Sequence, residues 1–262
     1  MRKISFILFL ALSLILFFLL LRNGAFSQRE TTAEADSLTQ NEMKQWAKKK
    51  IVKNKDSLLS EAFFDKWEQA SAKYARLHSN PKIDSIYQKI FTYVRDSISK
   101  HDPYGDRAWE ADCKYIVLPC LVDVCDYDTI KEQDTKDYRK EAIVGRNLPG
   151  YELKTSRYYI PHIASDKPVL YDFPSIREVL EKYIDKNEDE VRDRVKELRK
   201  YFPVDSYHWG HGWYFSSMPI IFRINLYDKC VIVNTRTSWC TGGDFYLPLG
   251  SDEIKWMGGW ME

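Results

Sequence analysis

The amino-acid sequence predicts an α+β fold in which N-terminal helices and one long central helix pack on a curved antiparallel sheet, preceded by a signal peptide or membrane anchor. Apolar residues recur at helical spacing over 59–98 and 176–198, and alternate over 213–262, which predicts a C-terminal β-meander. Helices followed by a run of strands are typical of α+β domains. The chain has 262 residues, 44% of them hydrophobic and 15% aromatic, which suffices for a core and excludes disorder throughout.

A basic start followed by a long apolar run predicts export. Arg2 and Lys3 precede the uncharged run from Ile4 to Leu21. Ala25 and Ser27 supply the small residues of a cleavage site, which favours a cleaved signal peptide. The length of the run favours an uncleaved anchor, because a membrane-spanning helix needs about 17 to 25 residues. Both interpretations place the rest of the chain outside the cytoplasm.

The sequence divides into three regions. Residues 1–27 are the signal peptide or N-terminal anchor, 28–57 a polar lead-in or stalk, and 58–262 a single extracytoplasmic α+β domain. Residues 28–262 carry 36 Lys and Arg against 38 Asp and Glu, which makes nucleic acid an unsuitable partner. Membrane contact is expected only through the N-terminal segment, if that segment is not cleaved. The chain has no N-glycosylation sequon, which favours a bacterial cell envelope, with the domain periplasmic, secreted or anchored.

Three amphipathic helices are predicted in the first two thirds of the domain. One apolar stripe runs from Leu59 to Leu77, and a second from Ile83 to Ile98, so that the two form a helical hairpin. The long central helix follows Pro174 and holds one apolar face until Pro203. At its start, Ser175 and Glu178 have the spacing of a capping box.

Short β-rich segments precede the meander. The segment from Tyr115 to Tyr127 is rich in β-branched residues and contains Pro119, which predicts a strand near a sheet edge. Further extended pieces are predicted at 158–160 and 169–171, and another strand at Trp213 and Phe215.

Alternation in the meander predicts its register. A hairpin loop at Asp228-Lys229 sets Leu226 against Val231, Ile224 against Val233 and Phe222 against Thr235, which makes one face apolar. The opposite face carries Arg223 against Asn234 and is wet or lines a pocket. For the next hairpin, a three-residue loop at 241–243 sets Trp239 against Phe245. Gly258-Gly259 predicts a bulge in the last strand, which starts at Ile254.

Helices packed on such a meander give an architecture that is similar, at the level of the fold, to nuclear-transport-factor-2-like and cystatin-like domains. The resemblance covers the last quarter of the chain and its helices, and no diagnostic motif accompanies it. It implies a cup-like surface for a ligand or a partner.

The five cysteines all lie in the predicted exported region, where disulfides persist. We expect a bridge between the segment that holds Cys113, Cys120 and Cys125 and the segment that holds Cys230 and Cys240. Two alternatives stay open, a zinc site and thiols buried as small hydrophobic side chains.

One segment carries candidate catalytic chemistry. Asp205, His208 and His211 are spaced at intervals of three, so they supply metal ligands or an acid-base pair if the chain turns there. Cys240 is a candidate nucleophile with either histidine as its base. These residues support an alternative function, an extracytoplasmic and metal-dependent hydrolase. The alternative for the segment is a loop whose side chains pack at the sheet entrance.

Aromatic and charged residues near the tip of the meander predict a recognition surface, although the same residues also suit a core with a wet rim. The candidate ligand-binding residues are Trp209, Trp213, Arg236, Trp239 and Asp244. The preferred hypothesis is therefore a non-catalytic module of the bacterial cell envelope that binds a protein or a small ligand. It includes no cofactor and no metal.

Overall fold

The computed structural model describes residues 61–77, 79–101, 110, 112–129, 151–185, 190–206, 212–237 and 241–261. The predicted signal peptide or anchor and the polar stalk lie outside these residues. In the described part of the chain, no helix is both long and apolar enough to cross a membrane.

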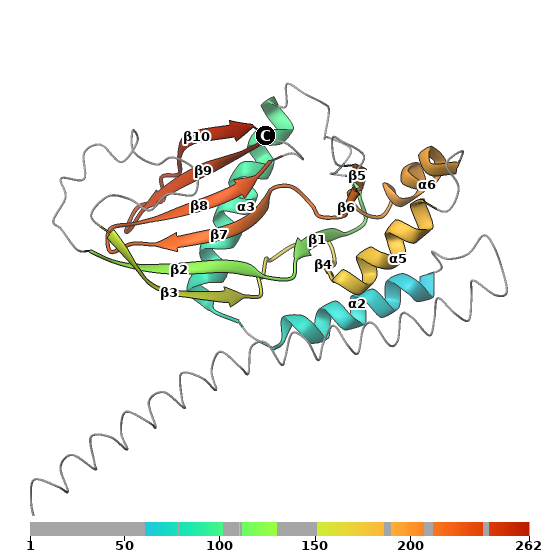
Figure 1. Cartoon of the computed structure of the whole chain (residues 1–262), viewed down its shortest axis with the longest axis horizontal. Coiled ribbons are helices and arrows are strands. Elements are labelled where there is room, and N and C mark those ends of the chain that lie inside the picture. The colour runs from blue at the N-terminus through green and yellow to red at the C-terminus, as the bar shows by residue number, and fades with distance from the viewer. Residues whose placement is uncertain are drawn as a thin grey trace, which may run out of the picture.

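A six-stranded sheet dominates the fold and confirms the α+β prediction (Figure 1). Its strands lie in the order β10-β9-β8-β7-β2-β3, and all neighbours are antiparallel except the parallel pair β2 and β7. The strands are β2 (Val122–Thr129), β3 (Tyr151–Tyr159), β7 (Ile220–Leu226), β8 (Cys230–Arg236), β9 (Thr241–Pro248) and β10 (Lys255–Met261).

Helix α3 (Pro81–His101) lies behind the sheet in Figure 1 and covers one of its faces. The Asn80 side chain caps this helix, accepting hydrogen bonds from the backbone N–H groups of Lys82 and Ile83. The ring of Tyr93 packs edge-on against Phe245, with 6.1 Å between ring centroids. Because side chains alternate along a strand, Val231 and Val233 of β8 and Phe245 and Leu247 of β9 enter the same apolar core.

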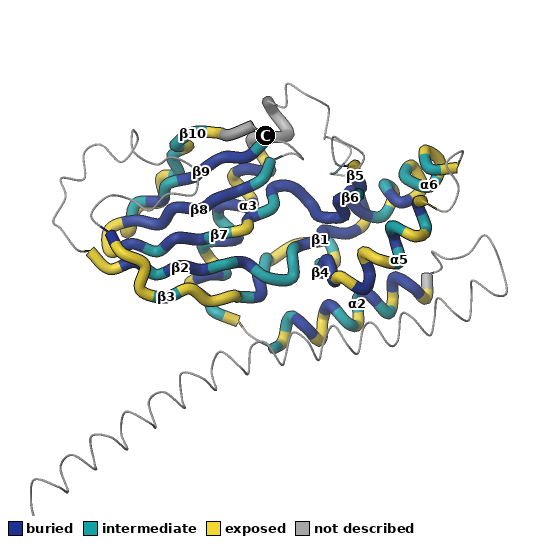
Figure 2. The backbone as a smooth tube through the Cα atoms, viewed as in Figure 1, coloured by how far each residue is buried: buried dark blue, intermediate teal, exposed yellow. Residues whose placement is uncertain are grey.

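A second layer lies at one end of the sheet. Helix α2 (Glu61–Ala75) packs on strand β4 (Val169–Asp172), which pairs in parallel with β1 (Ile116–Pro119). The fully buried Trp67 indole of α2 donates a hydrogen bond of 2.8 Å to a backbone carbonyl of β4. Figure 2 shows buried residues along both β1 and β4.

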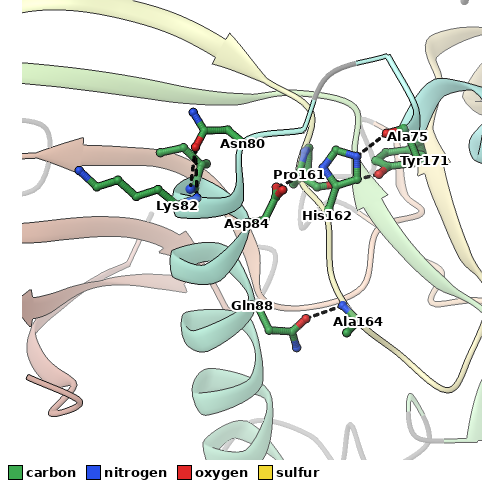
Figure 3. A network of polar contacts seen from close by, with 10 residues as sticks. Ala75, Asn80, Lys82, Asp84, Gln88, Pro161, His162, Ala164 and Tyr171 are labelled. Atoms are coloured by element: carbon green, nitrogen blue, oxygen red, sulfur yellow. Dashed lines mark hydrogen bonds and ion pairs between the residues drawn. The ribbon is translucent and has the colours of Figure 1, made fainter.

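His162 fixes the junction between these layers (Figure 3). Its Nδ1 lies 3.1 Å from Oδ1 of Asp84 in α3, and its Nε2 lies 2.6 Å from the carbonyl oxygen of Ala75 at the end of α2. With an acceptor at each nitrogen, the imidazole donates both hydrogen bonds when it is doubly protonated. Two residues on, the Ala164 amide donates to Gln88 of α3 at 2.6 Å.

The two predicted N-terminal helices are confirmed as α2 and α3, but the predicted hairpin is not, because α2 packs on β4 while α3 covers the six-stranded sheet (Figure 1). A single central helix is not confirmed either. The described residues form α5 (Pro174–Ile184) and α6 (Val191–Leu198) on either side of residues 186–189. The predicted capping box is wrong. Phe173 is the N-cap residue and makes no side-chain capping hydrogen bond, because Pro174 already begins the helix and moves Ser175 into its first turn.

The predicted strand from Tyr115 to Tyr127 is divided between β1 and β2, and β2 lies one strand from the sheet edge. The strand predicted at Trp213 and Phe215 is present as β6 (Trp213–Tyr214). It pairs with β5 (Asp205–Ser206) in a separate two-stranded ladder.

The register of the first hairpin is confirmed at Leu226 with Val231 and at Ile224 with Val233. Beyond Arg223 the prediction is wrong, because a bulge lets Ile221 instead of Phe222 pair with Thr235. Ile221 is fully buried as a result, whereas Phe222 is exposed.

The second hairpin is also paired differently. Phe245 pairs with Val233, not with Trp239, and Gly242 and Gly243 are strand residues of β9. A Cβ atom at Gly243 would lie 2.8 Å from Nε1 of Trp256, so glycine allows the indole to approach the strand. The bulge predicted in the last strand is confirmed between Trp256 and Gly258.

The disulfide prediction is wrong for the four described cysteines, none of which is in a disulfide. The thiols of Cys113 and Cys120 donate hydrogen bonds to backbone carbonyl oxygens at 3.3 and 3.1 Å. Cys125 and Cys230 pack among tyrosine rings in a small apolar cluster. Cys113, Cys125 and Cys230 are buried, as small hydrophobic side chains commonly are, and Cys120 is partly buried. Cys240 lies outside the described residues.

Candidate functional site

The sheet face opposite α3 carries the candidate site. In Figure 1 no labelled helix lies in front of β7, β8 and β9. Directly paired residues of neighbouring antiparallel strands share a face, and so do every second residues along one strand. We call this surface the polar face and define it by Asp123, Arg223, Asn225, Asn234, Arg236, Asp244 and Gly258.

A row of hydrogen bonds crosses four strands of the polar face. The Tyr127 hydroxyl donates to Oδ1 of Asn225 at 3.4 Å, and Nδ2 of Asn225 donates to Oδ1 of Asn234 at 2.9 Å. Nδ2 of Asn234 then donates to Oδ1 of Asp244 at 2.7 Å. Every donor points toward Asp244, so the bonds polarise one another in the direction that stabilises a negative charge at the end of the row. We call these four residues the polar row.

The Asp244 carboxylate ends the polar row in a nearly dry position. The residue is 3% exposed, and burial raises the pKa of its carboxyl group, while the hydrogen bond from Asn234 acts in the opposite direction. Among the residues that the structure describes, Asn234 is its only hydrogen-bonding partner. A buried carboxylate without a cation is costly to ionise, so this position favours the arrival of a positive charge or a further donor.

The other carboxylate of the polar face is already neutralised. Nε of Arg223 donates to Oδ2 of Asp123 at 3.0 Å, and the Ser156 hydroxyl donates to Oδ1 at 2.6 Å. On the polar face, the Asp123 carboxylate of β2 therefore has both a cation and a hydroxyl donor, whereas the Asp244 carboxylate of β9 has a single amide donor among the described residues.

The predicted ligand-binding residues fall into separate places. Arg236 lies on the polar face with Asp244, and its Nη1 donates to the Tyr214 hydroxyl at 2.7 Å. Trp213 instead donates from its indole nitrogen to Asp185 at the end of α5, at 2.9 Å, and thereby holds β6 to that helix. Trp209 and Trp239 lie outside the described residues.

The candidate catalytic segment is described only at its start. Asp205 lies in β5, and its carboxylate is 3.6 Å from Nη2 of Arg199. His208 and His211 lie outside the described residues, as does Cys240, so the hydrolase alternative stays a prediction. Within the described ranges, no group of three or more His, Cys, Asp or Glu residues is placed to hold a metal ion.

Sequence reasoning identified the polar side of the first hairpin but missed the polar row. Asn225 was not singled out, although it alternates with Arg223 on one strand as Asn234 alternates with Arg236 on the next. This alternation of polar residues is the sequence signal that places Asn225 on the polar face. Tyr127 could not be found in this way, because it joins the row from a strand far earlier in the chain.

The arrangement can bind and orient a ligand through hydrogen bonds and charge. No protein-family model, curated protein or solved structure is significantly similar to this chain.

Proposed function

We propose that the protein is a non-catalytic binding module of the bacterial cell envelope, and that the polar face holds its ligand or partner. The apolar N-terminal run supports export, and the near-neutral domain suits a role apart from nucleic acid. The polar face supports binding.

The observation that carries this proposal is the environment of Asp244. A carboxylate that is 97% buried, with one amide donor from the described residues, reduces folding stability compared with an apolar side chain there. Groups that cost stability in the unbound protein are expected where a ligand supplies the missing interaction. Three further polar residues support this carboxylate from neighbouring strands, so its position is built into the sheet.

A ligand screen with matched variants tests the proposal. The full chain in mild detergent is heated with a panel of small amines, carboxylates, phosphates, sugars and capped tripeptides. A compound at 100 times its Kd is expected to raise Tm by roughly 5–10 °C.

The effect should be lost in Arg236→Ala, which alters the polar face, and kept in Arg76→Ala, which removes an exposed guanidinium next to α2. If no compound stabilises the protein, or every compound acts equally on both variants, the polar face is not the binding surface.

A further inference from the structure

Gly258 lies directly opposite Asp244 in the pairing of β10 with β9. A Cβ atom built at Gly258 would have no described atom within 4 Å, and the backbone there does not have a positive φ. The neighbouring glycines differ, because a Cβ would lie 2.8 Å from the Trp256 indole at Gly243 and 3.0 Å from a backbone oxygen at Gly259. Packing therefore accounts for Gly243 and Gly259 but not for Gly258, which leaves space on the polar face beside a buried carboxylate.

The buried carboxylate of Asp172 and the partly buried carboxylate of Asp123 are each paired with an arginine. Asp123 is bound by Arg223, and Asp172 is bound by Arg177 and by the Ser216 hydroxyl. Asp244 is less exposed than either, and none of the described residues offers it a cation. A positive charge that entered the space beside Gly258 would face this carboxylate, and the burial of Asp244 would weaken the screening of their attraction by solvent.

The shape of the acceptor favours one type of cation. A guanidinium group is planar and binds best through two parallel hydrogen bonds to both oxygens of a carboxylate, which requires an open approach along the edge of that carboxylate. An ammonium group is a compact point charge that needs only one oxygen. Such a group can approach Asp244 from the side of Gly258, where no described atom lies within 4 Å of the Cβ position.

We propose that the space between Gly258 and Asp244 receives a primary ammonium group of the ligand, which pairs with the Asp244 carboxylate. This inference rests on the proposed function and gives the chemical class of the ligand, a small primary amine. The polar row then supports an ammonium site, since Asn234 donates to Oδ1 of Asp244 and leaves Oδ2 to the ligand.

Carbon NMR of the full chain in mild detergent tests the proposal, with ¹³Cγ-labelled aspartate and n-butylamine hydrochloride as the probe. The resonance that is missing from the spectrum of Asp244→Asn belongs to Asp244. We expect n-butylamine to shift this resonance saturably at neutral pH, and 1-butanol and sodium butyrate to leave it unmoved.

Filling the space should remove the site. Gly258→Val is expected to weaken n-butylamine binding at least tenfold, while Lys154→Ala, an exposed change on β3, keeps it. If Gly258→Val folds poorly, Gly258→Ala adds a single methyl group where no described atom is near, and a measurable loss of affinity is still expected.

The proposal is overturned if n-butylamine leaves the Asp244 resonance unmoved, if 1-butanol moves it equally, or if binding is unchanged in the folded Gly258 variants. Should that happen while another compound of the screen still acts through Arg236, only the ammonium site is refuted and the binding function stands. If the screen also finds no compound that depends on the polar face, both proposals are refuted.

Discussion

Asn234 is the central residue of the polar row, and Asn234→Ala removes two hydrogen bonds at once. The Asp244 carboxylate loses the 2.7 Å bond from Nδ2, and Asn225 loses the 2.9 Å bond to Oδ1. Asn225 keeps a bond of 3.3 Å to the carbonyl oxygen of Ile232. Because Asn234 and Asp244 are both buried, water does not readily replace the lost donor.

The magnitude follows from these two bonds. A hydrogen bond to a charged group contributes about 1.5–3 kcal/mol to stability, and a bond between neutral groups about 0.5–1.5 kcal/mol. Asn234→Ala should therefore lower the free energy of unfolding by about 2–4.5 kcal/mol at neutral pH. In the Asp244→Asn background both lost bonds are neutral, so the same change should cost only about 1–3 kcal/mol.

Urea unfolding followed by tryptophan fluorescence measures all four proteins of this double-mutant cycle. The coupling between Asn234 and Asp244 is expected to be about 1 kcal/mol or more, with an unchanged m value. A loss below about 0.5 kcal/mol for Asn234→Ala would refute the importance of the polar row. An equal loss in both backgrounds would show that the charge of Asp244 has no part in it.

Three further predictions concern buried groups. Burial raises the pKa of Asp244 above its value in the unfolded chain, so the fold loses stability as the pH rises and this carboxyl group ionises. Asp244→Asn should therefore raise Tm at pH 8 but not at pH 3, and an equal change in Tm at both pH values would contradict this. Burial raises the pKa of Cys113 to about 11 and of Cys230 to about 12, so at pH 8 no more than about one thiol in a thousand is ionised. Mass spectrometry should find both alkylated slowly by iodoacetamide in the native protein and rapidly in urea, whereas rapid native labelling would place them at the surface. The buried Tyr87 hydroxyl has no hydrogen-bonding partner among the described residues, so Tyr87→Phe should leave stability unchanged or raise it by about 1 kcal/mol in urea unfolding. Tyr171→Phe removes a 2.7 Å bond to a backbone carbonyl and should lower stability by about 1–3 kcal/mol, and the opposite order of the two variants would contradict the assignment.

Periodicity predicted the parts of the fold that depend on local pattern. The apolar stripes located α2 and α3, and alternation located the first hairpin with its register at Ile224 and Leu226. These elements bury one continuous face, and a face is visible in the sequence because it repeats at a fixed interval. The central helix shows the limit of this reasoning, since its stripe continues across a segment between two described helices.

Tertiary contacts determine the parts of the sheet register that sequence alternation does not predict. Gly242 and Gly243 have the composition of a turn, yet they are strand residues that pair with β8. At Gly243 the reason for a glycine is the Trp256 ring, which a Cβ atom would meet at 2.8 Å. The bulge at Phe222 likewise places Ile221 in the core, where it is fully buried, and leaves Phe222 exposed.

The candidate site was predictable in part. Arg236 and Asp244 were identified from their place near the tip of the meander, and both lie on the polar face. The hydrogen bond from Asn234 to Asp244 and the rest of the polar row were missed because a hydrogen-bonded row across a sheet depends on strand order, which alternation within one strand does not contain. The cysteine prediction relied on the compartment in which disulfides persist, whereas a bridge also requires two sulfur atoms within bonding reach.

The parallel pairing of β2 with β7 has a consequence for how the protein folds. Strands β7 to β10 are neighbours in sequence and need only short turns, whereas Asp123 and Arg223 pair across nearly a hundred intervening residues. Closing so long a loop has a high entropic cost, so we expect the meander to form first and β2 with β3 to dock later. Pulsed hydrogen exchange would detect this as late protection of the amides in the parallel pair, and simultaneous protection would contradict it. Because Tyr127 arrives with β2, the polar row is completed only in the last step of folding.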